Sequence, residues 1–136
     1  MIITHGQAIR MLNAALAKAE EFGVNVGISI VDAHGDLVAS VRMTGSEHAW
    51  LADDSRGKAM ATIAWKGEPS GNLQERANSP MLTWLNNHYH GQLNYLRGAV
   101  GIRNQAGELV GAIGAGGAPL EQDEAIALAG AAVLEG

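Results

Sequence analysis

The first 22 residues carry apolar side chains at helical spacing. These positions, three or four residues apart, are Ile9, Leu12, Leu16 and Ala19. Thr4 and Gln7 have the spacing of a capping box, and Gly23 suits the left-handed residue that follows a helix end. The pattern predicts an amphipathic helix over residues 5–22.

Two later segments alternate apolar residues with smaller or polar ones at a period of two. In the first segment, the alternating positions are Val26, Ile28 and Ile30, then Leu37, Ala39, Val41 and Met43. A turn-rich stretch at 32–36 separates its two halves. The Gly-Glu-Leu-Val-Gly stretch at 107–111 resembles the Gly-Asp-Leu-Val-Ala stretch at 35–39, and a short strand pattern at 99–103 precedes it. Two similar hairpins predict one antiparallel sheet.

The region between the hairpins favours helix. Few helix-breaking residues interrupt 51–65, so we expect a helix there, followed by a turn or loop at 67–71. Shorter elements are expected as helical segments at 73–76 and 81–86 and as a strand at 92–96.

The last element begins at Pro119 and carries negative charge in its first turn. Glu121, Asp123 and Glu124 lie where the helix dipole is positive, which predicts a C-terminal helix. The whole order of elements predicts an α+β protein with helices packed against the sheet. Self-association would cover the exposed sheet edges and apolar faces, so we expect a homo-oligomer.

Composition and charge narrow the classes of function. The chain has 136 residues, 47% of them hydrophobic, which fits a single domain over residues 1–136. A formal net charge of -5 without a run of Lys or Arg argues against nucleic acid and anionic membranes as partners. The N-terminal stretch lacks the order of a signal peptide, so we expect a cytoplasmic protein. The lack of Cys excludes disulfides and thiolate chemistry.

Several stretches, taken in order, carry a resemblance to a known family. They are Ile30–Asp32 with Gly35 and Leu37, Arg42–Gly45, Lys58–Ala59, Gly111–Gly114 with Gly117–Ala118, and Gln122–Glu124. Together they resemble the GlcG/HbpS-like family, which is related to the C-terminal domain of PduO-type cobalamin adenosyltransferases. The resemblance covers nearly the whole chain.

That resemblance carries expectations for fold and function. It implies a profilin-like fold with a five-stranded antiparallel sheet flanked by helices, and a homo-oligomer built from dimers. It also implies a small-ligand-binding protein, with haem as the candidate cofactor, associated with small-molecule catabolism.

The glycine run at 111–117 is the first candidate site. Small residues between a strand and an acid-rich helix would let a ligand approach backbone N–H groups. Its candidate ligand-binding residues are Gly111, Gly114, Gly116 and Gly117. Tight packing of the sheet is the alternative explanation for the same residues.

His88 and His90 form the second candidate site. Imidazole nitrogens bind haem iron, and the two side chains would face the same way if this stretch were extended. The alternative is a solvated loop that contains two His residues.

Charged residues form a third candidate site. Arg56 and Lys58 would hold a carboxylate, while Asp123 or Glu124 would act as a general base, and Glu124 is also a candidate for ligand binding. The alternatives are a solvated helix face for the two cations and helix-start electrostatics for the acids.

Aromatic and sulfur-containing side chains supply candidate apolar walls. A cavity for a planar ligand could be lined by Trp50, Trp65, Trp84, Met43, Met60 and Met81; the alternative is that these residues belong to the core or a subunit interface.

Two hypotheses for the function follow from these candidate sites. The first is a small-ligand-binding protein that takes haem or another planar or carboxylated molecule in a pocket between the helix expected at 51–65 and the second hairpin. The second is an enzyme or accessory factor that acts on a small carboxylic-acid metabolite.

Overall fold

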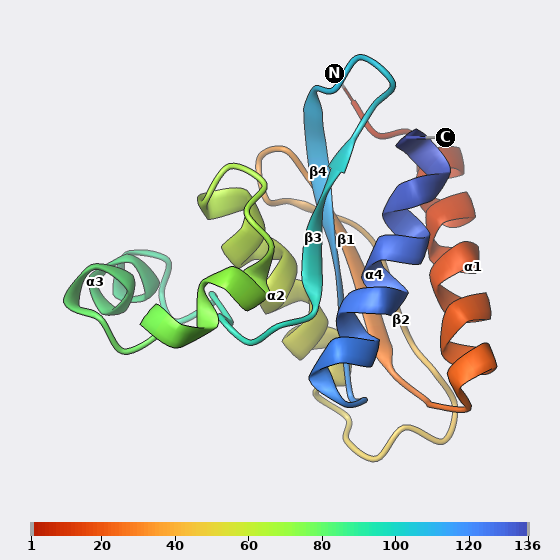
Figure 1. Cartoon of the computed structure of the whole chain (residues 1–136), viewed down its shortest axis with the longest axis horizontal. Helices are drawn as coiled ribbons and strands as arrows, with labels where there is room; N and C mark the ends of the chain where they lie inside the picture. The colour runs from red at the N-terminus through yellow and green to blue at the C-terminus, as the bar shows by residue number, and fades with distance from the viewer. Residues whose placement is uncertain (1, 136) are drawn as a thin grey trace.

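The computed structural model describes residues 2–135, which form four helices and one four-stranded sheet (Figure 1). The helices are α1 (His5–Phe22), α2 (Leu51–Ala64), α3 (Pro80–His88) and α4 (Leu120–Glu135). The strands are β1 (Gly27–Asp32), β2 (Leu37–Arg42), β3 (Ala99–Arg103) and β4 (Leu109–Gly116). Short 3-10 turns occur at Ser70–Asn72 and Gln74–Arg76. The predicted α+β class is confirmed.

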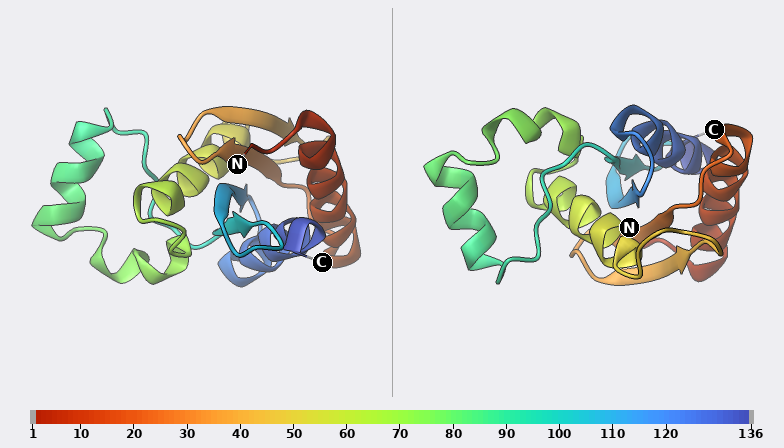
Figure 2. Two further views of the ribbon diagram at one scale, coloured as in Figure 1. Left: turned by 90° about the horizontal axis from the view of Figure 1, so that it is seen from above. Right: turned by 90° about the horizontal axis from the view of Figure 1, so that it is seen from below.

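The two predicted hairpins share one antiparallel sheet with the strand order β2-β1-β4-β3. Within the hairpins, β1 pairs with β2 and β3 pairs with β4. Strand β1 also pairs with β4, with Ile30 opposite Ile113, and this pairing joins the two hairpins. Helices α1 and α4 pack together on one face, and α2 covers the other (Figures 1 and 2). The sheet is therefore sandwiched between two helical layers.

The boundaries of α1 follow from its local sequence. Thr4 Oγ1 accepts a hydrogen bond from the Gln7 N–H at 3.1 Å, and the Thr4 N–H donates to Gln7 Oε1 at 3.0 Å. Gly23 ends the helix with a φ of 71°. These contacts satisfy main-chain groups that a helix end leaves free, and the predicted bounds of 5–22 are confirmed.

The expectation of a fifth strand is wrong for the described residues. The segment 92–96, predicted as a strand, makes other main-chain contacts. Its Asn94 N–H donates to the Gly57 carbonyl at 3.1 Å, and the Leu96 N–H donates to Asn94 Oδ1 at 3.1 Å. Because these donors bond to α2 and to a side chain rather than to a neighbouring strand, the segment lies across α2 and the sheet has four strands.

Residues 66–98 leave the sandwich and return to it, with α3 at the far end of this excursion (Figures 1 and 2). Leu82 packs with Leu73 and Tyr95 in an apolar cluster separate from the main core. On the same helix, Met81 and Trp84 are 61% and 60% exposed. The predicted short helical segments are confirmed, and α3 presents apolar side chains to solvent.

None of the helices in residues 2–135 combines the length and the apolar character needed to cross a bilayer.

Candidate functional site

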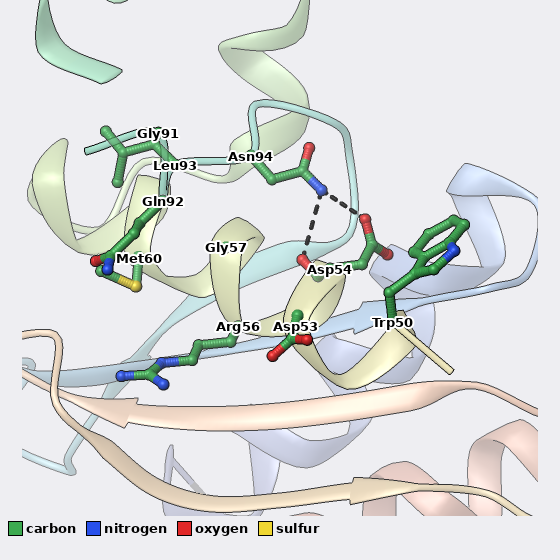
Figure 3. Close-up of a pocket in the computed structure, with 10 residues that line it drawn as sticks. All are labelled: Trp50, Asp53, Asp54, Arg56, Gly57, Met60, Gly91, Gln92, Leu93 and Asn94. Atoms are coloured by element: carbon green, nitrogen blue, oxygen red, sulfur yellow. Dashed lines mark hydrogen bonds between the residues drawn. The ribbon is translucent and has the colours of Figure 1, made fainter. Parts of the chain in front are cut away.

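A pocket of about 450 Å³ lies between α2 and the segment 91–94, within the volume range of small-molecule sites (Figure 3). From α2 and its start come Trp50, Asp53, Asp54, Arg56, Gly57 and Met60, and from the facing segment come Gly91, Gln92, Leu93 and Asn94. The sequence predicted a pocket between this helix and the second hairpin, whereas the wall that faces α2 is the segment that precedes that hairpin.

The pocket combines apolar surface with one cation, Arg56, and two carboxylates, Asp53 and Asp54. Trp50 lies at one end and Met60 at the other (Figure 3). The Trp50 side chain is 55% exposed and stacks on His48 with ring centroids 4.7 Å apart. Arg56 lies on the exposed side of α2 between these ends. A planar ligand with a carboxylate would find both an aromatic surface and a guanidinium group here.

The segment 91–94 approaches α2 closely because residue 57 is glycine. A Cβ atom at Gly57 would lie 3.0 Å from Asn94 Cβ and 3.1 Å from the Gln92 carbonyl oxygen. Asn94 then fixes the segment, since its Nδ2 donates to Asp54 Oδ1 at 2.5 Å (Figure 3). Asp54 and Asn94 therefore join the two walls of the pocket.

Behind Asp54, the ammonium group of Lys58 is buried among oxygen atoms. Lys58 Nζ donates to the Ala115 carbonyl at 2.9 Å and to Asp123 Oδ2 at 3.2 Å, and it lies 3.5 Å from Asp54 Oδ2. The residue is 1% exposed. Two of these oxygens accept hydrogen bonds from the ammonium group, and the third belongs to an ion-pair partner.

Two glycines make space for the ion pair of Lys58 and Asp54. A Cβ atom at Gly98 would lie 2.9 Å from Lys58 Nζ, and one at Gly116 would overlap Asp54 Oδ2. The sequence singled out Gly116 as a ligand contact. In the structure it lies against the Lys58–Asp54 ion pair.

Asp123 is 1% exposed although it carries a carboxyl group. Desolvation raises the pKa of Asp123 to about 6, against the opposing attraction of Lys58 and a hydrogen bond from the Ala118 N–H. The ordinary value of 3.8 applies to the unfolded chain, so the folded protein takes up this proton first as the pH falls. The group therefore contributes stability that is complete below about pH 4 and is lost as the pH rises through about 6.

We expect Asp123→Asn to remove one component of the pH dependence of stability. Between pH 5 and 7.5, titration of Asp123 should lower the free energy of unfolding by about 1 kcal/mol, and the variant should lack this loss. Urea unfolding at several pH values measures the difference. Glu121→Gln changes an exposed acid two residues away and is the matched control, so its free energy of unfolding should vary with pH as in the unchanged protein. If the free energy of unfolding of Asp123→Asn varied with pH as in the unchanged protein, the raised pKa of Asp123 would be contradicted.

The structure separates the charged residues that the sequence grouped. Arg56 is exposed and lines the pocket, whereas Lys58 is buried and bonds within the fold. Asp123 faces Lys58, whereas Glu124 pairs with Arg97 Nη1 at 3.3 Å. The geometry therefore does not favour one substrate carboxylate held by both cations, and the enzyme hypothesis gains no support from it.

Close packing accounts for two further glycines of the run 111–117. A Cβ atom at Gly111 would overlap the Val31 carbonyl oxygen, and one at Gly114 would overlap the Ser55 carbonyl oxygen. Gly117 differs because it is exposed and has a φ of 117°, in the region that favours glycine. Ligand binding by Gly111, Gly114 and Gly117 stays a prediction.

The two candidate His residues do not lie on an extended stretch. His88 is the last residue of α3 and stacks on Trp84 with centroids 5.3 Å apart, while His90 adopts a positive φ of 59°. The premise that they face the same way from a strand is therefore wrong. His90 directly precedes Gly91 in the pocket wall. Within residues 2–135, no group of three or more His, Asp or Glu side chains is arranged to hold a metal ion.

The six candidate wall residues divide between several environments. Trp50 and Met60 line the pocket, and Trp65 packs against the small apolar cluster. Met81 and Trp84 on α3 face solvent, and Met43 packs against the main core. Sequence reasoning did not commit to Asp54, although it lies four residues before Lys58 on the same helix, and Asn94 carried no signal of its own.

Comparison with known proteins decides the family. The family model described as "Haem degrading protein HbpS-like" matches residues 3–132. The chain belongs to the HbpS-like family. The resemblance seen in the sequence is thus confirmed. Searching the curated proteins gives no match.

Several solved structures share this fold. A PduOC–haem complex is 27% identical, with 98% of this chain and 95% of that chain covered and a TM-score of 0.83. A double mutant of Streptomyces reticuli HbpS is 28% identical, with 98% and 88% covered and a TM-score of 0.83. Klebsiella pneumoniae ORFY, at 24% identity, 97% and 90% coverage and a TM-score of 0.86, supports the fold alone.

Proposed function

We propose that this HbpS-like protein binds haem in the pocket between α2 and residues 91–94. The observation that carries the proposal is the similarity to PduOC, which was solved as a haem complex and matches over nearly the full length of both chains. The family description, which names a haem-degrading protein, supports the same ligand.

The side chains of the pocket suit the chemistry of haem. The half-exposed Trp50 ring and the Met60 side chain offer apolar surface to a porphyrin face, and Arg56 offers two N–H donors to a propionate carboxylate. His90, next to the pocket wall, is the first candidate for the iron ligand, and His88 is the second. Bound haem would supply redox and ligand-binding chemistry at its iron.

Self-association belongs to the same proposal. The exposed Met81 and Trp84 on α3 form an apolar surface that a homo-oligomer built from dimers would cover. A cytoplasmic location and an association with small-molecule catabolism stay predictions.

Titration of the apoprotein with hemin tests the proposal. We expect a sharp, saturable shift of the Soret band at one haem for each one or two chains, because the absorption of haem changes when its iron gains a protein ligand. Arg56→Ala should weaken binding by about tenfold, since a charge-assisted hydrogen bond contributes about 1.5 kcal/mol or more. Arg10→Ala, an exposed Arg on α1, is the matched control and should bind as the unchanged protein does.

The iron ligand is tested separately. His90→Ala should change the Soret position and weaken binding, and His34→Ala, in the β1–β2 turn, should do neither. Unchanged spectra for both His88→Ala and His90→Ala would remove the ligand assignment. A response to hemin that does not saturate in the unchanged protein would contradict the proposed function itself.

A further inference from the structure

A continuous chain of polar contacts links the buried start of α4 to the pocket. Asp123 Oδ2 lies 3.2 Å from Lys58 Nζ, and Lys58 Nζ lies 3.5 Å from Asp54 Oδ2. The other oxygen of Asp54 accepts the hydrogen bond from Asn94 Nδ2. Asp54 therefore touches the buried ammonium group with one oxygen and the facing pocket wall with the other.

The charges of Asp123, Lys58 and Asp54 do not balance. Two carboxylates share one ammonium group when both are ionised, so the group carries a net charge of -1 beside the pocket. Within the described residues, the charged groups that act on Asp123 are Lys58 and Asp54, both from α2, and the Ala118 N–H is its main-chain donor. Arg97 is engaged by Glu124 at the neighbouring position of α4.

Protonation of Asp123 changes what Lys58 neutralises. With Asp123 neutral, Lys58 and Asp54 form a one-to-one pair, and the excess negative charge of this cluster is lost from the pocket wall. Asp53 and Arg56, the other charged residues that line the pocket, are not part of this cluster. This matters for the ligand because Asp54 lines the pocket and because haem carries carboxylates. In a partly buried site such interactions are only weakly screened.

We propose that Asp54 transmits the charge state of Asp123 to the pocket, so that the pocket binds an anionic ligand more tightly when Asp123 is protonated. Asp54 is thereby a specificity-determining residue, and Lys58 and Asp123 are positioning residues that act through it. The inference rests on the proposed haem pocket for its ligand. By linkage, binding of the anion must in turn favour the protonated form of Asp123.

The first test compares hemin affinities at equal pH, where effects of pH on hemin itself cancel. At pH 7.5, Asp123→Asn should bind hemin about fivefold more tightly than the unchanged protein, and at pH 5.5 the difference should shrink to about twofold or less. Glu121→Gln removes an exposed charge from the same helical turn and should match the unchanged protein at both pH values. Equal affinities of Asp123→Asn and the unchanged protein at pH 7.5 would overturn the proposal.

The second test needs no ligand. In the apoprotein, the NMR resonances of the Asn94 side-chain amide should shift with a midpoint near pH 6, where Asp123 titrates, and they should stay constant in Asp123→Asn. Failure of hemin to bind, together with a titrating Asn94 amide, would reject the haem proposal while keeping the coupling. A constant Asn94 amide in the unchanged protein would reject the coupling even if hemin binds.

Discussion

Replacing Lys58 with Met is expected to lower the free energy of unfolding by about 3–5 kcal/mol at pH 7.5. Met keeps a long unbranched side chain but removes the ammonium group that Asp54 and Asp123 both contact. Asp123 is almost fully buried, so its charge would be left in the protein interior without compensation. Urea unfolding followed by circular dichroism measures the loss.

Lys18→Met provides the matched control for this prediction. Lys18 pairs with Glu21 at 3.3 Å on the surface of α1, where an ion pair contributes less than about 1 kcal/mol. The defect of Lys58→Met should also become smaller toward pH 5, because protonation of Asp123 then removes the uncompensated charge. A Lys58→Met variant as stable as Lys18→Met at pH 7.5 would show that the buried ion pairs do not stabilise the fold.

Gly114→Ala is expected to destabilise the protein by about 3 kcal/mol through overpacking. The added Cβ would overlap the Ser55 carbonyl oxygen and lie 3.2 Å from the Ala59 nitrogen. Both are main-chain atoms of α2, so a change of side-chain rotamer gives no relief and the helix must move away from the sheet. The decrease in the urea midpoint, with the slope unchanged, reports this cost.

Gly6→Ala tests whether the loss at position 114 comes from contact rather than from glycine replacement in general. Gly6 lies in α1, and among the described residues the nearest atom to its added Cβ, apart from the backbone of the helix itself, is Thr4 Oγ1 at 3.9 Å. Ala has the higher helix propensity, so this variant should gain about 0.5–1 kcal/mol. A Gly114→Ala variant as stable as the unchanged protein would mean that α2 and β4 can separate at little cost.

Much of the secondary structure could be predicted because its signals are local. The Thr4–Gln7 capping box and Gly23 define α1 within a few residues of its ends. The segment 92–96 resisted prediction because its main-chain partners include Gly57, which is distant in sequence and leaves no pattern near residue 94. A strand and an ordered loop across a helix can share the same apolar spacing.

The candidate site could be predicted only in part. The sequence identified Arg56 as a cation for a carboxylate, and the structure places Arg56 in a pocket. It grouped Lys58 with Arg56 because both lie on one helix, yet the two side chains have opposite exposure. The packing of α2 against β4 determines which side of α2 is buried. The composition of the helix alone did not reveal that side.

By itself, the sequence determined the α+β class, the helix ends, the two hairpins and the family, because capping, alternation and turns are properties of neighbouring residues. Only the tertiary structure decided the number of strands, the place of the pocket and the partners of Lys58. Lys58 and Asp123 are 65 residues apart, and their contact depends on α2 and α4 meeting at the end of β4. Burial then raises the pKa of Asp123, an effect of desolvation that no local pattern contains.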